Sequence, residues 1–255
     1  MITAGIDAGI EYIKAVVMKD GKVVGKAIGD SGGAGRSAAV QAVYDKALCD
    51  AGIKAGDVEK VFATGKGKFD APFADDRPAE LVTVAKAARL AAPEATAVIS
   101  IGADEIIAAT FNGGDIKEFV LNQKCAAGLG LFLENMAERL EISIDELSAL
   151  DKPSTVAVNE GCVVFAELDA LSLLNRGTDV KEVARALIEA CAWRASMTIN
   201  DIYKPDTACV VLMGGLAQNG AFMKALERIS GIKFVIPNDP VYGGSIGAAA
   251  LAAAG

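Results

Sequence analysis

The chain of 255 residues contains no histidine, and this absence excludes several kinds of site at once. Ser-His-Asp and Cys-His catalysis, imidazole zinc sites and a histidine general base all need an imidazole ring. Any acid–base or metal chemistry must therefore use carboxylates, thiolates, lysine or backbone groups.

Other absences limit the partners and the compartment. No run of lysines or arginines is present, and 33 acidic residues outnumber 25 basic ones to give a net charge of −8. We therefore expect no nucleic-acid partner, because phosphate backbones are bound by basic stripes. The first 17 residues lack a basic start and carry Asp7 and Glu11, and the longest apolar run elsewhere, residues 245–254, is too short to cross a bilayer. These features predict a cytoplasmic protein without a membrane segment.

The five cysteines are odd in number and irregular in spacing, and no export signal precedes them. This pattern argues against a disulfide framework and leaves thiols or metal ligands. Cys49, Cys191 and Cys209 lie in apolar helical or strand stretches, where we predict small buried side chains.

The remaining two cysteines, Cys125 and Cys162, each stand in a loop that opens an apolar-periodic helix. The first-turn amides and the positive end of the helix dipole favour a thiolate there, and favour an anionic iron–sulfur cluster more. Two cysteines supply half the ligands of a 4Fe–4S cube, so this interpretation requires a partner chain. The alternative is that both are buried structural thiols.

An internal repeat indicates the architecture. Residues 3–24 and 97–119 each have an apolar strand, a Gly/Asp turn, a second strand, a Gly-containing turn and a third strand. Helical periodicity follows each copy, at 36–51 in the first half, and at 130–140 and 163–175 in the second. Such repetition predicts two similar lobes that face each other.

We expect lobe I to cover residues 1–95 and lobe II to cover residues 96–239. The small-residue helix within 240–255, which follows a Gly-Gly turn, is expected to pack back on lobe I.

The first turn of each copy has the composition of a phosphate-binding turn. Gly9 and Gly102 let backbone amides approach phosphate oxygens, and Asp7 and Asp104 can hold the water shell of Mg²⁺. Two such turns facing across a cleft would hold a nucleotide polyphosphate from both sides. The alternative is that both are ordinary hairpin turns.

A third glycine turn ends an apolar strand near residue 214 and opens a helix near Asn219. Bare backbone at Gly214 and Gly215 can accommodate a flat ring, and Gln218 or Asn219 can reach its polar groups.

Taken together, GIDAG, SIGAD, MGGLAQN, ATGKGK, KCAAGLGLFLENMA and GCVVFAE run over nearly the whole chain. In these motifs the sequence resembles the ATP-dependent activator family of 2-hydroxyacyl-CoA dehydratases and the ATPase subunits of benzoyl-CoA reductases. The two cysteine segments are the most specific part of the resemblance. It implies an α/β, two-lobed, actin-like and ribonuclease-H-like duplicated fold with a nucleotide cleft between the lobes.

The resemblance also implies the activity. A homodimer, or a pair of related subunits, would hold one 4Fe–4S cluster at its interface, bind ATP or ADP with Mg²⁺, and pass low-potential electrons to an acyl-CoA dehydratase or reductase. Ferredoxin or flavodoxin would be the donor. By this resemblance the cluster ligands are Cys125 and Cys162, the phosphate-turn residues are Asp7, Gly9, Lys14, Gly102 and Asp104, and the adenosine corner is Gly214, Gly215, Gln218 and Asn219.

The turns depart from the family pattern. Ile10 and Glu11 stand where family members carry a small hydroxyl residue, and Ala103 stands in a turn that usually reads Gly-Gly-Gln-Asp. Glu11 places a negative charge near the expected phosphate. One alternative is therefore a non-catalytic, cluster-binding partner subunit with a degenerate ATP site. A separate alternative, which would use the same cleft for phosphoryl transfer, is a small-molecule kinase of the sugar or acetate type.

Overall fold

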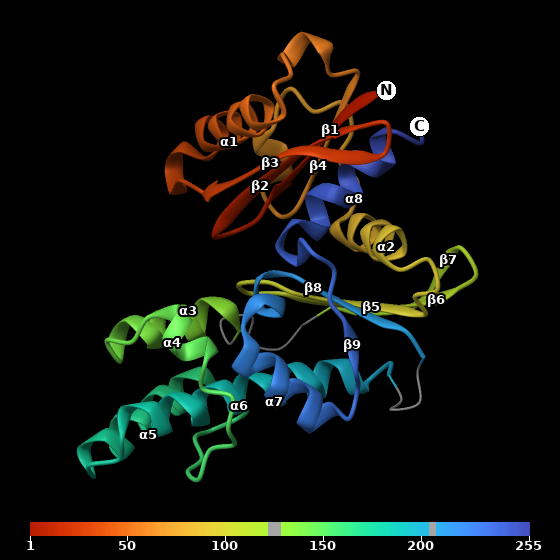
Figure 1. Ribbon diagram of the computed structural model, residues 1–255. Coiled ribbons are helices and arrows are strands. Elements are labelled where there is room, and N and C mark those ends of the chain that lie inside the picture. The colour runs from red at the N-terminus through yellow and green to blue at the C-terminus, as the bar shows by residue number, and fades with distance from the viewer. Residues whose placement is uncertain (122–128, 204–207) are drawn as a thin grey trace. The chain divides into compact units, whose positions relative to one another are not determined.

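A computed structural model describes residues 1–121, 129–203 and 208–255, in two compact units (Figure 1). Unit 1 consists of Met1–Pro93 and Val241–Gly255, and unit 2 consists of Glu94–Pro240. One predicted cluster ligand, Cys125, lies outside the described residues.

Unit 1 is built on a four-stranded sheet of order β3-β2-β1-β4. Its strands are β1 (Ile2–Ala8), β2 (Tyr12–Lys19), β3 (Lys22–Asp30) and β4 (Lys60–Thr64). The first three form an antiparallel meander, and β4 runs parallel to β1. Asp20 and Gly21 both have positive φ, 50° and 78°, which is the backbone of a tight two-residue hairpin turn.

Both faces of this sheet are covered by helices: α1 (Arg36–Ala51) on one face and α8 (Gly243–Ala252), with α2 (Glu80–Ala91) beside it, on the other (Figure 1). Successive side chains of β2 point to opposite faces of the sheet, and apolar residues on both faces explain the two helical layers. Ile13, Ala15 and Val17 pack with α1, whereas Val16 and Met18 pack with α8. A strand that is apolar on both faces is stable only between two layers.

Glycines allow α8 to approach its neighbours closely. A Cβ on Gly5 of β1 would lie 2.0 Å from the Ser245 carbonyl oxygen, and one on Gly247 would lie 1.8 Å from the Thr83 carbonyl oxygen of α2. Backbone atoms at these distances leave no room for a methyl group. The small residues of α8 are therefore a packing requirement of unit 1.

Replacing Gly247 by alanine is expected to destabilise the protein by at least about 3 kcal/mol, because the two helices must separate to admit the methyl group. Denaturant unfolding measures the change. Gly56→Ala is the control, since a Cβ there would meet nothing within 4 Å. Equal stability of the two variants would contradict the close packing.

Unit 2 repeats the same topology with one more strand. Its sheet has the order β7-β6-β5-β8-β9, made of β5 (Ala97–Ile101), β6 (Ile106–Asn112), β7 (Asp115–Leu121), β8 (Val210–Met213) and β9 (Phe234–Val235). Strands β5 to β7 are antiparallel, and β8 runs parallel to β5, as β4 does to β1. The second hairpin of each unit carries a register shift, at Val17/Met18 and at Thr110/Phe111. The duplication predicted from the sequence is confirmed.

The helices of unit 2 pack with one face of its sheet around a core that includes Ile99, Ile101, Leu133, Leu187 and Phe222. They are α3 (Gly130–Arg139), α4 (Ile144–Ser148), α5 (Val163–Asn175), α6 (Val180–Asn200) and α7 (Gly220–Ser230). Short 3₁₀ turns complete the fold at Gly33–Gly35, Ala55–Asp57, Lys68–Asp70, Gly215–Gln218 and Pro240–Tyr242. In the described ranges, no helix combines the length and apolar character that membrane crossing requires.

One prediction about the cysteines was wrong. Cys191 is fully buried in α6, as expected, but Cys49 is exposed on α1 and Cys209 is partly exposed just before β8. Cys49 lies two positions after the buried Ala47, about 200° around the helix, and therefore on its outer face.

Candidate functional site

Asp7 and Lys14 form the centre of the candidate site in unit 1. They are directly opposite in the β1–β2 pair, and Lys14 Nζ lies 3.5 Å from Asp7 Oδ2. Asp7 is 6% exposed. The turn that joins the two strands is closed by a hydrogen bond from the Gly9 amide to the Tyr12 carbonyl at 3.0 Å. A nearly buried carboxylate is thus held beside a lysine at the end of a glycine turn.

Two further glycines border the Asp7 carboxylate. A Cβ on Gly65, in the loop after β4, would lie 2.7 Å from Asp7 Oδ1, and one on Gly244, in the first turn of α8, would lie 3.0 Å from Asp7 Oδ2. Gly65 also has φ of +85°, which favours glycine. Bare backbone therefore surrounds the carboxylate on two sides, and side chains at 65 or 244 would displace it.

This arrangement suits a hydrated Mg²⁺ and phosphate oxygens. A carboxylate can hold the water shell of the ion, while Lys14 and the helix N-terminus of α8 favour negative charge nearby. The sequence predicts Asp7, Gly9 and Lys14 as site residues but does not bring Gly65 or Gly244 to them. Both are glycines at the junction of a regular element and a turn, Gly65 after a strand and Gly244 at the start of a helix. The sequence spacing alone does not predict that position 244 lies beside position 7.

The corresponding turn of unit 2 joins β5 to β6. The Gly102 amide donates to the Glu105 carbonyl at 2.9 Å, and Asp104 is partly exposed. The start of α3 rests on this turn, because the Leu131 amide donates to the Ala103 carbonyl at 3.0 Å. A Cβ on Gly130 would lie 3.0 Å from the Gly102 carbonyl oxygen, so a bare backbone permits the contact.

The glycine corner predicted to receive adenosine lies after β8. Gly214 has φ of +91°, and a Cβ there would be 2.2 Å from the Ile101 carbonyl oxygen, so the corner packs closely on β5. Gly215 and Gln218 are exposed to solvent. Asn219 is buried and its Oδ1 accepts from the Phe222 amide at 2.9 Å, which makes it the N-cap of α7. The side-chain oxygen of Asn219 therefore caps α7.

Cys162 is the N-cap residue of α5 and is partly exposed. An Asx turn precedes it, because Asn159 Oδ1 accepts from the amides of Gly161 at 3.0 Å and Cys162 at 2.8 Å. Asp169 of α5 in turn accepts from the Asn159 amide at 2.9 Å. The loop that presents the Cys162 sulfur is thus fixed to the helix that it opens.

Two other described cysteines of unit 2, Cys191 and Cys209, lack this setting. Burial raises the pKa of the Cys191 thiol, and burial followed by the charge of Glu94 raises the pKa of the Cys209 thiol. Both therefore remain neutral thiols near pH 7. Within the part of the chain that the structure covers, no group of three or more cysteine, aspartate or glutamate side chains is gathered as a metal site.

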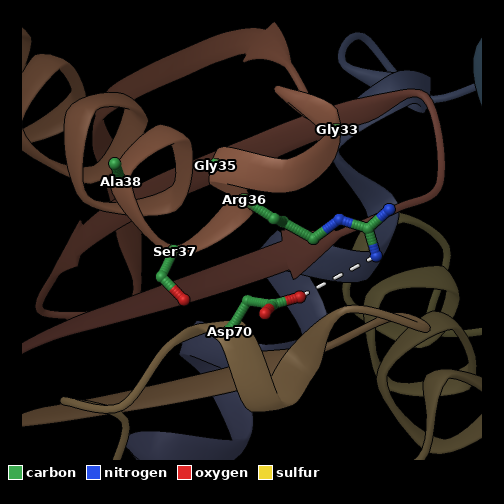
Figure 2. Close-up of a pocket in the computed structure, with 6 residues that line it drawn as sticks. All are labelled: Gly33, Gly35, Arg36, Ser37, Ala38 and Asp70. Carbon is green, nitrogen blue, oxygen red and sulfur yellow. Dashed lines mark ion pairs between the residues drawn. The ribbon is translucent and has the colours of Figure 1, made fainter.

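A pocket of about 310 Å³ lies elsewhere in unit 1, between the start of α1 and the 3₁₀ turn Lys68–Asp70 (Figure 2). Its two charged lining residues pair with each other, Arg36 Nη1 to Asp70 Oδ2 at 3.8 Å. The rest of its lining is Gly33, Gly35, Ser37 and Ala38. Because its charges compensate, this pocket is a weaker candidate than the turn around Asp7.

The model of the BadF/BadG/BcrA/BcrD ATPase family matches residues 4–252. The chain belongs to this family. It is 34% identical to the activator of lactoyl-CoA dehydratase of Anaerotignum propionicum, over 99% of this chain and 97% of that protein. It is 30% identical to one of the benzoyl-CoA reductase subunits of Thauera aromatica, over 97% of this chain and 92% of that protein. The family resemblance predicted from the motifs is confirmed.

Solved structures agree with this membership. The activating component of the (R)-2-hydroxyglutaryl-CoA dehydratase of Acidaminococcus fermentans matches with a TM-score of 0.90 and 32% identity, covering 99% of this chain and 97% of that chain. The activator of the 2-hydroxyisocaproyl-CoA dehydratase of Clostridium difficile, solved with bound ADPNP, also reaches 0.90, with 29% identity and coverage of 99% and 94%.

A ROK family glucokinase of Streptomyces griseus matches with a TM-score of 0.63 and 16% identity, covering 100% of both chains, which shows likeness of fold alone. The predicted α/β class of actin-like and sugar-kinase-like folds is confirmed by these neighbours.

Proposed function

We propose that this family member is an ATP-dependent electron-transfer activator that holds a 4Fe–4S cluster at a dimer interface and delivers low-potential electrons to a CoA-thioester dehydratase or reductase. The observation that carries the proposal is the likeness over nearly the full chain to dehydratase activators, one of them solved with ADPNP. Membership in an ATPase family supports ATP as the nucleotide.

The residues around Asp7 support the nucleotide half of the proposal. Asp7 would hold Mg²⁺ through its water shell, Lys14 would contact phosphate, and the amide of Gly9 is placed in the turn between them. Asp104 and Gly102 would take the same roles in the turn of unit 2. Exposed Gly215 and Gln218 leave the glycine corner after β8 open to an adenine ring.

The chemistry of Cys162 supports the cluster half. Its sulfur stands at the N-terminus of a 13-residue helix, is partly exposed and is held by an Asx turn, all of which suits a thiolate ligand. Cys125 would be the second ligand from the same chain, and a second copy or a related subunit would supply the other two. When bound, a 4Fe–4S cluster supplies a one-electron couple whose potential depends on its charge, hydrogen bonds and exposure.

An apolar face on α5 supports the second copy as partner. Val164, Phe165, Leu168 and Leu171 are between 55% and 61% exposed and lie on one side of the helix that Cys162 opens. A contiguous exposed apolar face of this kind marks a protein interface. Because a copy that brings its own Cys162 to the same cluster also brings its own α5, this face would be buried between the chains.

Leu168→Asp is therefore expected to convert the dimer to a monomer, since a carboxylate would be buried in an apolar contact. Light scattering of the anaerobically purified protein measures the change in mass. Leu90→Asp is the matched control, because Leu90 is a 50% exposed leucine on α2 in unit 1. A Leu168→Asp protein that stays dimeric would remove this face from the interface.

Contacts in unit 2 offer a route by which nucleotide binding would change the surroundings of the cluster. The 102–105 turn accepts a hydrogen bond from Leu131 of α3, and α3 directly follows the segment that carries Cys125. Movement of the turn on ATP binding would therefore displace the start of α3. ATP reacts with water to give ADP and phosphate, and one electron leaves the reduced protein for the acceptor in the arrangement that this displacement favours.

Glu11 weakens nucleotide binding in this account. Removing its charge by Glu11→Gln is expected to lower the Kd for ATP by roughly fivefold, or about 1 kcal/mol, because a like charge near phosphate is lost. Titration calorimetry with ATP and Mg²⁺ measures this. Glu59→Gln, at an exposed acid of unit 1, should leave the Kd unchanged. Unchanged affinity in the Glu11 variant would place the phosphates elsewhere.

The proposal as a whole is tested by transfer to an acceptor. Anaerobic protein reduced by ferredoxin or flavodoxin should hydrolyse ATP and activate a resting 2-hydroxyacyl-CoA dehydratase, with no activation by ADP. Iron binding without measurable ATP affinity or turnover would instead favour the non-catalytic partner subunit. Phosphorylation of a sugar or acetate by the chain alone would favour the small-molecule kinase and contradict the proposal.

A further inference from the structure

Arg194 of α6 contacts the loop that carries Cys162 and the ring of Phe132 in α3. Its Nη1 donates to the Glu160 carbonyl at 3.4 Å, two residues before Cys162. Its guanidinium carbon lies 5.3 Å from the ring centroid of Phe132 in α3, the helix that follows the Cys125 segment. Helix α6 itself packs beside α3 and α5 (Figure 1). One side chain therefore links the Cys162 loop to α3.

The positive charge of Arg194 is not compensated by its observed contacts. Besides the Glu160 carbonyl and the ring face, Nη2 donates to Cys191 Sγ at 3.3 Å, and that buried thiol is neutral. Nε is buried and has no hydrogen-bond partner in the described part of the chain. The side chain is only partly exposed, so solvent screens its charge incompletely. Structural arginines in such positions are normally paired with a carboxylate.

We propose that Arg194 is a positioning residue for Cys162: it ties the Cys162 loop to α3 and places a positive charge, which no carboxylate in the described part of the chain pairs with, near this proposed sulfur ligand. The effect of the Arg194 charge on the reduction potential rests on the proposed function. The effect of Arg194 on the position of the Cys162 loop does not, because it concerns the protein alone. A positive charge near a cluster favours the reduced form, which carries one more negative charge. Arg194 would thus raise the potential at which the protein accepts its electron.

Two substitutions separate the two effects. Arg194→Lys keeps the charge but loses the planar fork and much of the stacking on Phe132, whereas Arg194→Gln loses the charge and the stacking. Both should loosen the loop, and only the second should change the potential. Lys181→Gln is the control, because it removes one positive charge from the exposed start of the same helix, far along the axis from Arg194.

The first measurement is hydrogen exchange in the iron-free protein. In peptides that cover 156–162, exchange should be roughly tenfold faster in both Arg194 variants than in wild type, because the loop has lost a tether. The control should match wild type. Unchanged exchange in both Arg194 variants would overturn the positioning role, whether or not the protein binds iron.

The second measurement is a redox titration of the anaerobically purified protein followed by electron paramagnetic resonance. Arg194→Gln should lower the midpoint potential by about 59 mV, which is a tenfold change for a one-electron couple. Arg194→Lys should stay near wild type. Equal potentials for wild type and Arg194→Gln would overturn the charge role. A wild-type protein without iron would overturn the proposed function while the exchange result still decides the positioning role.

Discussion

Cys162→Ser is expected to remove the iron from protein purified without oxygen. Wild type should hold about four irons per two chains, and the variant less than about one. The reason is that a serine hydroxyl does not replace a thiolate at an iron site, and Cys162 would supply one ligand from each of two chains, half of the set. Iron analysis and the brown absorbance of the cluster measure the loss.

Cys49→Ser provides the control for this result. Cys49 is an exposed cysteine on α1 of unit 1, so the substitution has the same chemistry outside the proposed site. It should retain the iron of wild type. If Cys162→Ser keeps full iron, or if Cys49→Ser loses it, the assignment of the ligands fails.

Asp7→Asn is expected to lower ATP hydrolysis by roughly two to three orders of magnitude with little loss of stability. The amide is nearly the same size as the carboxylate and fits between Gly65 and Gly244, but it lacks the charge that holds the Mg²⁺ water shell and pairs with Lys14. Phosphate release under anoxia measures the rate, and thermal unfolding measures the stability.

The control for the Asp7 prediction is Asp20→Asn. Asp20 lies in the turn that follows β2. Asp20 has φ of 50°, a conformation that asparagine also accepts, and its partner is the N-terminal ammonium group. ATP hydrolysis should stay at the wild-type level. A fully active Asp7→Asn protein would show that the first turn does not bind the metal–nucleotide complex.

Much of the fold was predictable because its signals are local. The helices at 36–51 and 163–175 begin and end where periodicity placed them, and the repeated hairpins follow from strand alternation broken by glycine turns. Cys49 shows the limit of the same signals. An apolar stretch indicates a helix, but the face that each residue occupies depends on which side meets the sheet.

The candidate site was predictable only in part, for a physical reason. Asp7 and Lys14 come together because antiparallel pairing across one turn sets their register, which a short stretch of sequence contains. Gly244 lies against Asp7 because α8 returns to unit 1 from the far end of the chain, and no local pattern encodes that contact. Arg194 is a similar case, since its contact with the Cys162 loop depends on the packing of α6.

Native mass spectrometry under strict anoxia shows directly whether two chains share one cluster. We expect one species of two chains that carries a single Fe₄S₄ unit and loses both the cluster and the dimeric mass when oxygen is admitted. Iron-free dimers prepared under the same anoxia, or a monomer that carries its own cluster, would contradict it.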